Sequence, residues 1–354
     1  MRVLHLYRPQ LPGQRAQAIQ VLHTCHALAA RGHRVTLLAD RGDAPATPQR
    51  ALAALGLEPS PHLDLRIAPI RQRGLAGLWF RAELARWWGG TPGVVLARDK
   101  RRLQAALRSH GGRHRVVLET HELDSGLIAD AGEDPAEARA VERALLSQCD
   151  ALVANCLGTL EAWRQAHGAA LPALQRVAHN ATAATRSRPA HPAPDRVVRC
   201  VGSLRSFKGF ADVLAAAPTL PLPLELVGGH ADELERSPTA GVRIRGAVPF
   251  PEVPDLLARS AVLLLPLADN RFGRSLTNPL KLWDYLATAA PIVAPALPTI
   301  DEVIQTTGAT LHRYQPGDGP SLVAAVLSAL AAPPRAPILR TWDDRASELE
   351  ELFR

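Results

Sequence analysis

The chain has 354 residues, of which 47% are hydrophobic and 21% are charged, and it contains 30 Pro and 25 Gly. At about 150 residues per domain this length predicts two domains that each bury a core, and the composition excludes a disordered or fibrous protein. The chain contains no run of 18 apolar residues, and its first residues do not resemble a secretory signal, so we expect a cytoplasmic protein. The four cysteines are far apart, without a Cys-x-x-Cys pair, and we expect neither a disulfide framework nor a metal site.

The net charge of +7 is concentrated in the first half of the chain. Residues 71–115 carry eleven basic residues against two acidic ones. Among them are seven large apolar side chains: Leu75, Leu78, Trp79, Phe80, Leu84, Trp87 and Trp88. Such a basic and aromatic stretch either associates peripherally with an anionic membrane or packs its Trp face on a sheet and leaves its charges solvated. We expect no nucleic-acid partner, because no known nucleic-acid module is recognisable.

The first half begins with the clearest structural unit. Residues 3–6 read as a buried strand, followed by a loop with Gly13 and Gln14, a helix over about 15–30 that ends at Gly32, and a strand over 35–39. This order is typical of a β-α-β crossover in a parallel sheet. Further strands are predicted at 65–68, 94–97, 116–118 and 151–154.

A second α/β series follows a Pro-rich linker. Its predicted strands are 197–202, 224–227, 242–244, 262–265 and 292–294, and a helix with an apolar stripe covers about 340–353. The sequence therefore predicts an α/β fold with two Rossmann-like, doubly wound parallel-sheet domains that face each other across a cleft. We expect the limits to be 1–186 for the first domain, 187–196 for the linker, 197–338 for the second domain and 339–354 for the last helix.

The segment 276–287 is the sharpest local signal in the second domain. Asn278 suits an N-cap and Pro279 a first helical position, so a helix is expected to begin at 279. Lys281 in the first turn fits a phosphate, and Asp284 could accept hydrogen bonds from ribose hydroxyls. The alternative is a capped helix with a solvated lysine and aspartate.

The loop after the strand at 197–202 is the second signal. Gly202 permits close approach to the backbone, Ser203 offers a hydroxyl, and Arg205 and Lys208 could clamp a diphosphate. Departure of a nucleotide from a sugar develops negative charge on the distal phosphate, which such cations stabilise. A loop of this kind with two cations is weak evidence by itself.

Two loops of the first domain could also contribute to a site. His121 and Glu122 follow the strand at 116–118 at its carboxyl end, where ligands bind in parallel sheets. Gly13 lets a ligand pass close to the backbone of the first loop. A lone histidine is otherwise more often structural. A dinucleotide fingerprint, a Walker A loop and a nucleophilic serine elbow are all absent from the sequence.

Taken in order, these segments resemble the retaining GT-B glycosyltransferases of the family 4 type over essentially the whole chain. The matching segments are 29–35, 119–122, 179–181, 202–209, 227–229, 244–246, 279–287 and 290–294. Each segment is degenerate, but the ordered set is specific.

The resemblance implies a role for each of these residues. Lys208, with Ser203 or Arg205, would contact the donor diphosphate and Asp284 the ribose. Residues Asn278, Leu280 and Lys281 at the helix start would contact the phosphates and the sugar. His121, the catalytic candidate, would reach the site from the first domain with Glu122 and the loop of Gly13 and Gln14, and the last helix would pack back on that domain. Family members need no metal or cofactor.

Three positions depart from the family pattern. Leu276 replaces the first carboxylate of a glutamate pair, Ser203 an arginine of the phosphate loop, and Ala181 a glycine. In spite of these departures, the resemblance implies a retaining transferase that moves a sugar from a nucleoside diphosphate sugar to an unidentified hydroxyl acceptor. An epimerase or phosphorylase on the same fold, or a non-catalytic paralogue, is the alternative.

Overall fold

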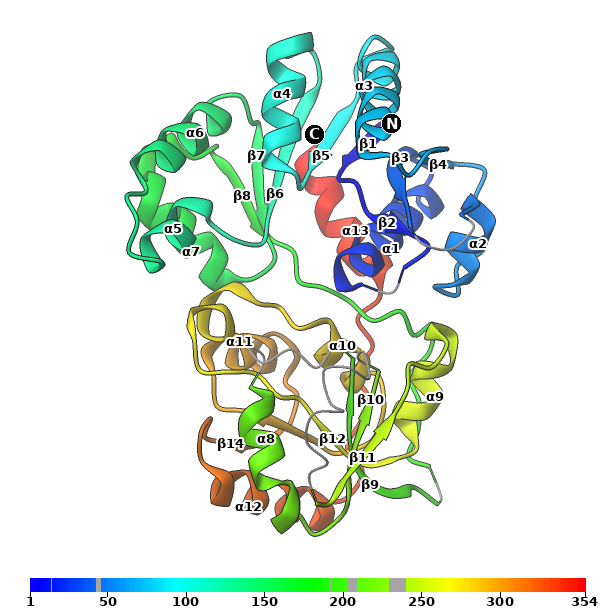
Figure 1. Cartoon of the computed structure of the whole chain (residues 1–354), viewed down its shortest axis with the longest axis vertical. Helices are drawn as coiled ribbons and strands as arrows, with labels where there is room; N and C mark the ends of the chain where they lie inside the picture. Colours follow the sequence, from blue (N-terminus) through cyan, green and yellow to red (C-terminus); the bar gives the residue numbers. More distant parts are fainter. Residues whose placement is uncertain (14, 43–45, 192, 203–208, 229–239) are drawn as a thin grey trace. The chain divides into compact units, whose positions relative to one another are not determined.

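The computed structural model describes residues 1–13, 15–42, 46–191, 193–202, 209–228 and 240–354. The chain divides into two compact units, Met1–His179 with Trp342–Arg354, and Asn180–Thr341 (Figure 1). The division falls earlier than the linker expected at 187–196, and Arg188 forms a β-bridge with Thr288 inside the second unit. Within the described ranges no helix has both the length and the apolar character needed to cross a membrane.

The first unit contains a parallel sheet with the strand order β2-β3-β1-β5-β6-β7-β8, and β4 pairs with β3. The strands are β1 (Arg2–Leu6), β2 (Gln10–Leu11), β3 (Arg34–Arg41), β4 (Leu63–Ile67), β5 (Val94–Ala97), β6 (Arg115–Thr120), β7 (Ala151–Ala154) and β8 (Leu174–Val177). The central strands are buried on both faces, as expected when helices cover both sides of a parallel sheet. The carboxyl ends of β1, β5 and β6 are neighbours in this order, so the loops that follow them meet at one edge.

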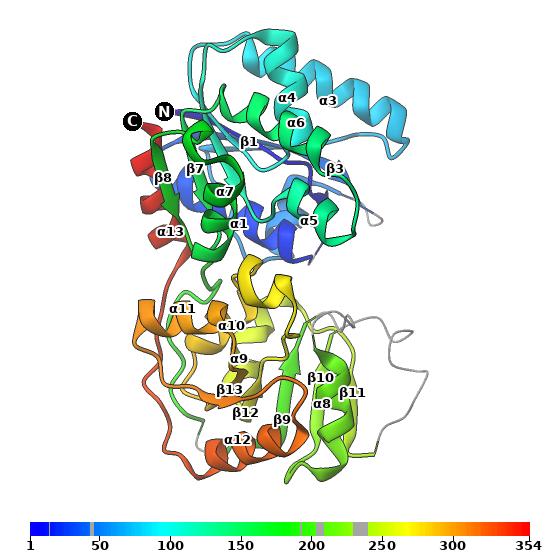
Figure 2. The same cartoon turned by 90° about the vertical axis from the view of Figure 1, so that its left-hand side faces the viewer.

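Helices cover both faces of this sheet. They are α1 (Ala16–Ala30), α2 (Pro48–Ala53), α3 (Arg73–Trp88), α4 (Lys100–His110), α5 (Asp124–Asp130), α6 (Ala136–Leu146) and α7 (Leu157–His167). One core, which includes Leu4, Trp88, Leu107 and Trp163, lies between the sheet and α3, α4, α6 and α7. Figure 2 shows α3 and α4 on one side of β1 and α1 on the other.

The last helix, α13 (Trp342–Glu350), belongs to the first unit and packs against α1. Its apolar stripe is buried: Trp342 stacks on His23 with ring centroids 5.6 Å apart, and Ala346 and Leu349 are fully buried. Arg31 and His33, which follow α1, bind Glu350 at 2.9 and 2.7 Å. The apolar stripe on α13 is thus covered by α1, which lies more than 300 residues earlier in the sequence.

The second unit contains a parallel sheet with the order β11-β10-β9-β12-β13-β14. The strands are β9 (Asp195–Val201), β10 (Leu224–Val227), β11 (Val242–Arg245), β12 (Ser260–Leu264), β13 (Ile292–Pro295) and β14 (His312–Tyr314). Helices α8 (Phe210–Ala216) and α12 (Gly319–Ala331) pack on one face. Helices α9 (Val253–Ala258), α10 (Leu280–Leu286) and α11 (Pro298–Thr307) pack on the other. Strand order turns back between β9 and β12, where ligands bind in such sheets.

The predicted fold of two doubly wound parallel sheets is confirmed, and every predicted strand is present. Three short strands were not predicted, β2, β8 and β14, because two to four residues of mixed polarity give no clear period. The end of α1 also differs in detail: Arg31 is the C-cap, and Gly32 follows it at φ +88°. There His33 N–H donates to Leu28 O, which closes a Schellman motif.

Candidate functional site

At the carboxyl edge of the second sheet, Lys281 lies directly over Gly202. A Cβ on Gly202 would come within 2.6 Å of Lys281 Cε, and the residue has φ +115°. The ammonium group lies 5.6 Å from the centroid of the Phe210 ring, at the start of α8. The backbone conformation of Gly202 therefore favours glycine, and a side chain there would displace the end of the Lys281 side chain.

Gly228 extends this surface onto the neighbouring strand. It follows β10 at φ +89°, and a Cβ there would lie 3.4 Å from Gly202 O. Gly202 N–H donates to Val227 O at 2.8 Å, so the ends of β9 and β10 are held together. Two strand ends without side chains, next to one lysine, leave backbone within reach of an anionic ligand.

Four predicted site residues lie outside the described residues: Gln14 in the first unit, and Ser203, Arg205 and Lys208 in the second. The described chain resumes at Gly209, with φ +76° and an ideal Cβ 2.8 Å from Leu267 C. In the sequence the three second-unit residues lie between Gly202, beside Lys281, and Gly209, which precedes α8.

The expected N-cap at Asn278 is wrong. Helix α10 begins at Leu280 with Pro279 in the N-cap position, and no side chain caps it. Asn278 Oδ1 instead accepts from Asn180 N–H and from Trp283 Nε1, both at 2.7 Å, while Asn180 Nδ2 donates to Asn278 O at 2.6 Å. Because one donor lies at the start of the unit and the other on α10, the asparagine side chain joins these two parts instead of capping the helix. Among the described residues, no hydrogen-bond partner meets the Asn278 Nδ2 group.

Asp284 lies one turn further along α10. Its Oδ1 accepts from the Thr182 hydroxyl at 2.8 Å. Burial raises the pKa of this carboxyl to about 6, against the opposite effects of the Thr182 hydroxyl and the Ala183 N–H. A carboxylate with such a pKa can accept hydrogen bonds from hydroxyls above pH 6. Thr182 was not predicted, since nothing in its sequence context marks it.

Tyr285, also not predicted, fixes α10 to the sheet. Its hydroxyl accepts from Val201 N–H at 3.1 Å and lies 3.4 Å from Leu264 O. The end of β9, the end of β12 and the first turns of α10 are therefore held in one arrangement, which places Lys281 over Gly202.

In the first unit, a buried polar cluster surrounds Glu119 at the carboxyl end of β6. Its Oε1 accepts from Gln20 Nε2 at 2.6 Å, from His121 Nε2 at 2.9 Å and from Arg345 Nη2 at 2.7 Å. His5 Nε2 lies 3.5 Å from Oε2. Glu119 and Arg345 are 1% and 0% exposed, so this is a fully desolvated ion pair. Arg345 also donates to the backbone oxygens of Ala178 and His179.

This cluster determines the charge of His121. Burial lowers the pKa of His121 to about 4, and Arg98 lowers it further, against the attraction of Glu119. The pKa of Glu119 stays well below its usual range, because Arg345 and the hydrogen bonds from His121 and His5 outweigh burial. At neutral pH His121 is therefore a neutral ring that donates through Nε2 to an ionised carboxylate.

Gly13 and Glu122 are used by the fold in ways not predicted. A Cβ on Gly13 would lie 2.8 Å from Gln10 O, so the turn itself requires glycine. Glu122 contributes its backbone oxygen, which accepts from the Thr120 hydroxyl at 2.8 Å and from Trp163 Nε1 at 3.3 Å, while its side chain is exposed.

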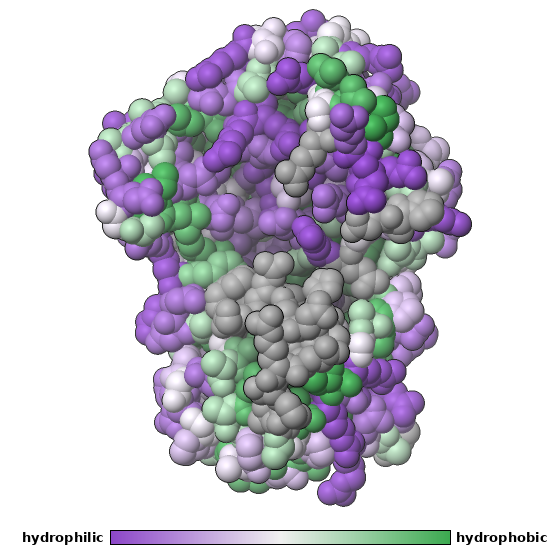
Figure 3. Space-filling view, viewed as in Figure 1, coloured by the Kyte–Doolittle hydropathy of each residue, from purple (hydrophilic) through white to green (hydrophobic). Residues whose placement is uncertain are grey.

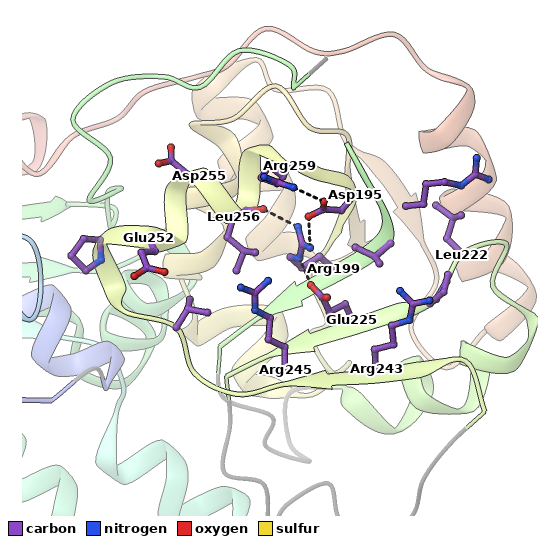
Figure 4. A pocket seen from close by; sticks show the side chains of 15 residues that line it. Asp195, Arg199, Leu222, Glu225, Arg243, Arg245, Glu252, Asp255, Leu256 and Arg259 are labelled. Carbon is purple, nitrogen blue, oxygen red and sulfur yellow. Dashed lines mark hydrogen bonds and ion pairs between the residues drawn. The ribbon is translucent and has the colours of Figure 1, made fainter. Parts of the chain in front are cut away.

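A groove on the second sheet lies largely away from the edge where ligands bind in this architecture. Its polar lining includes Arg199, Glu225, Arg243 and Arg245 from β9, β10 and β11 (Figure 4). Arg199 is buried and pairs with Glu225 at 2.5 Å and with Asp195 at 2.8 Å. Much of the groove lies at the amino ends of the strands and along α9.

Comparisons with known proteins assign the chain to a family. The family model of glycosyl transferases group 1 matches residues 195–332, and that of Glycosyltransferase Family 4 matches residues 17–186. The chain is a GT-B glycosyltransferase. The Family 4 match begins after β1 and β2 and covers the rest of the first sheet, and the group 1 match covers β9 to β14. No curated protein matches the sequence.

Solved GT-B structures share the fold over the whole chain. A sucrose-phosphate synthase from Thermosynechococcus elongatus is 19% identical, with a TM-score of 0.69, and the match covers 100% of this chain and 95% of that one. Anabaena HepE in complex with UDP and glucose is 15% identical, with a TM-score of 0.65 and the same coverage. A trehalose 6-phosphate synthase from Burkholderia multivorans is 12% identical, with a TM-score of 0.62, and covers 99% and 94%. At these identities the likeness concerns the fold.

Proposed function

We propose that this glycosyltransferase moves a sugar from a nucleoside diphosphate sugar to a hydroxyl acceptor with retention of configuration. The observation that carries the proposal is the position of Lys281 over Gly202, at the carboxyl ends of β9 and β10. One cation beside two strand ends that lack side chains suits a diphosphate, whose charge grows as the sugar leaves.

In this proposal Lys281 and the backbone of Gly202 and Leu280 contact the donor diphosphate. Ser203, Arg205 and Lys208 join them from the loop that begins at Gly202, on the strength of the family resemblance. Asp284 accepts from the ribose hydroxyls. Asn278 positions α10 through Asn180 and Trp283, and only its Nδ2 group remains for a ligand.

The first unit supplies the acceptor side. His121 is the catalytic candidate: at neutral pH its ring is neutral, and its Nε2–H is fixed on Glu119, which leaves Nδ1 as a hydrogen-bond acceptor for a hydroxyl. Retention and independence of metal ions and cofactors are parts of the proposal that come from the family resemblance.

Leu276 bears on donor choice. It is 3% exposed and ends the segment Phe272–Leu276, at the position where the family has a carboxylate. A buried leucine offers no oxygen to a sugar hydroxyl, so we expect the donor sugar to be read by backbone groups or by other side chains.

The decisive experiment measures the unfolding temperature of the protein with each member of a panel of UDP-, GDP- and dTDP-sugars. Hydrolysis of each donor is then measured with and without EDTA. A ligand that binds the folded state raises the unfolding temperature, so one donor of the panel should stabilise the protein and be hydrolysed in the presence of EDTA. Absence of binding and of hydrolysis for every donor would refute the proposal. A change in sugar configuration without an acceptor, or cleavage that requires phosphate, would favour the epimerase or phosphorylase alternative.

Only one edge of helix α3 is available for the peripheral membrane contact that the sequence suggests. Phe80, Leu84, Trp87 and Trp88 are buried in the core, so the Trp face packs on the sheet. Leu75 and Leu78 are 44% and 60% exposed, beside exposed Arg71 and Arg81. Figure 3 shows hydrophobic side chains among hydrophilic ones over α3.

We propose that this edge of α3 touches an anionic bilayer. Flotation with anionic liposomes should be lost in Leu75→Ser/Leu78→Ser, and failure of the wild-type protein to float would refute the contact.

A further inference from the structure

Arg98, which the sequence analysis did not single out, is a largely buried guanidinium at the carboxyl end of β5. Its backbone N–H donates to Leu6 O, which fixes it at the edge where β1, β5 and β6 end. Its Nη1 donates to Gln20 Oε1, and its Cζ lies 5.2 Å from the centroid of the Tyr7 ring. Part of its surface is exposed.

No carboxylate of the described chain forms an ion pair with Arg98. The acidic groups nearby are already engaged: Asp99 binds Arg102, Asp124 binds Lys100 at 2.7 Å, and Oε1 of Glu119 accepts from Arg345, Gln20 and His121. Burial lowers the pKa of the Arg98 guanidinium in spite of the attraction of Glu119 and of Glu122, whose side chain is exposed. These two carboxylates attract Arg98 from a distance, and neither forms an ion pair with it.

The edge thus holds two buried guanidinium groups, Arg98 and Arg345, for one buried carboxylate, Glu119. His121 and Gln20 are neutral and add no negative charge. A buried charge without a partner is costly, so an anion that pairs with Arg98 would bind favourably here. The planar guanidinium prefers a carboxylate or phosphate, which it can bind through two N–H groups.

We infer that Arg98 binds an oxyanion of the acceptor, a phosphate or carboxylate group, at the carboxyl edge of the first sheet. The bound anion lies beside Tyr7 and His121, and the acceptor hydroxyl is then close to the histidine proposed for catalysis. That the anion belongs to the acceptor rests on the proposed function. The existence of an anion site does not.

The test compares thermal unfolding in sodium phosphate, sodium acetate and sodium chloride at equal ionic strength. Lys281→Met is the background, because it removes one cation of the proposed donor site and so weakens anion binding in the second unit. In this background phosphate or acetate should raise the midpoint by about 3 °C at several times its dissociation constant. Arg98→Met should abolish the rise. Arg108→Met, which removes an exposed arginine from the far end of α4, should keep it. If neither anion stabilises the protein, or if Arg98→Met keeps the full rise, the site does not exist.

Should Arg98→Met disturb folding, Arg98→Gln is the second variant, because it keeps an amide donor for Gln20.

Two further results separate this site from the proposed function. A tenfold loss of nucleoside diphosphate affinity in either variant would assign the anion to the donor and overturn the acceptor role. If the wild-type protein binds and hydrolyses no donor at all, the proposed function fails, whatever the phosphate result.

Discussion

Arg345 of the last helix donates to Glu119 of β6 at 2.7 Å, and both side chains are fully buried. The pair joins residues 226 positions apart and holds the carboxylate that also orients His121. Helix α13 therefore supplies the guanidinium that pairs with the buried carboxylate of β6.

Removing the arginine should destabilise the fold strongly. Arg345→Met leaves the Glu119 charge buried without its main partner, and we expect a loss of about 3–5 kcal/mol in the free energy of unfolding, measured by urea denaturation. Glu119→Gln should cost a similar amount. The double variant should lose less than the sum of the two, because neither charge then remains alone. Strict additivity would show that the pair is not coupled.

A side chain at Gly202 should disturb the donor site. In Gly202→Ala the backbone at φ +115° becomes strained, and the new methyl group, built 2.6 Å from Lys281 Cε, displaces the end of the lysine side chain. We expect a stability cost of about 1–3 kcal/mol and at least a tenfold loss of donor affinity, measured by calorimetry. Gly308→Ala is the matched control: Gly308 has φ +69° and no neighbour within 4 Å, so it should cost stability and leave donor affinity unchanged. Equal donor affinity in both variants would contradict the placement of Lys281.

Asp284 should make stability depend on pH. An unfolded aspartate ionises near 3.8, whereas the pKa of the folded Asp284 is about 6. Between these values the folded state keeps a proton that the unfolded state has lost, so the free energy of unfolding falls as pH rises from about 4 to 6 and stays lower above it. Relative to wild type, Asp284→Asn should gain about 1–3 kcal/mol across this range.

A control for this prediction is available in Thr182→Val. Loss of the hydroxyl removes a hydrogen bond that favours the ionised carboxylate, so the pH-dependent fall should still begin near pH 4 and extend above pH 6. A pH-independent difference between Asp284→Asn and wild type would contradict the raised pKa.

His121 should be needed for turnover rather than for donor binding. His121→Ala should lower kcat about 100-fold, whereas donor affinity should change less than threefold. Because burial lowers the pKa of His121 to about 4, the wild-type rate should show no loss from histidine protonation between pH 8 and 5. A midpoint near 6.5 that disappears in His121→Gln would show that the ring is more accessible to protons than the structure implies.

The fold could be predicted from the sequence because its strands are short apolar runs between helical stretches. Runs such as Val94–Ala97 and Ala151–Ala154 are completely buried, and their limits were predicted to the residue. Local patterns could not place Arg345, since an arginine within an apolar stripe looks like a solvated exception until its partner on β6 is known.

The candidate site was predictable only in part. Gly202 and Lys281 were selected by residue type, and the structure brings them into contact. The role of Asn278 was mistaken because a good N-cap residue can instead serve tertiary donors, here Asn180 N–H and Trp283 Nε1. Arg98 was overlooked because its significance lies in the lack of an ion pair with any carboxylate of the described residues, which a sequence does not show.

The most direct test of the account is a calorimetric titration of UDP, GDP and dTDP into wild type, Lys281→Met and Arg243→Met at fixed ionic strength. Arg243→Met removes an exposed cation from β11 and serves as the charge-matched control. The account predicts that one nucleoside diphosphate binds the wild type and the control equally, and binds Lys281→Met at least tenfold more weakly, with the unfolding temperature unchanged. Equal affinity for all three proteins, or no binding of any nucleoside diphosphate, would contradict it.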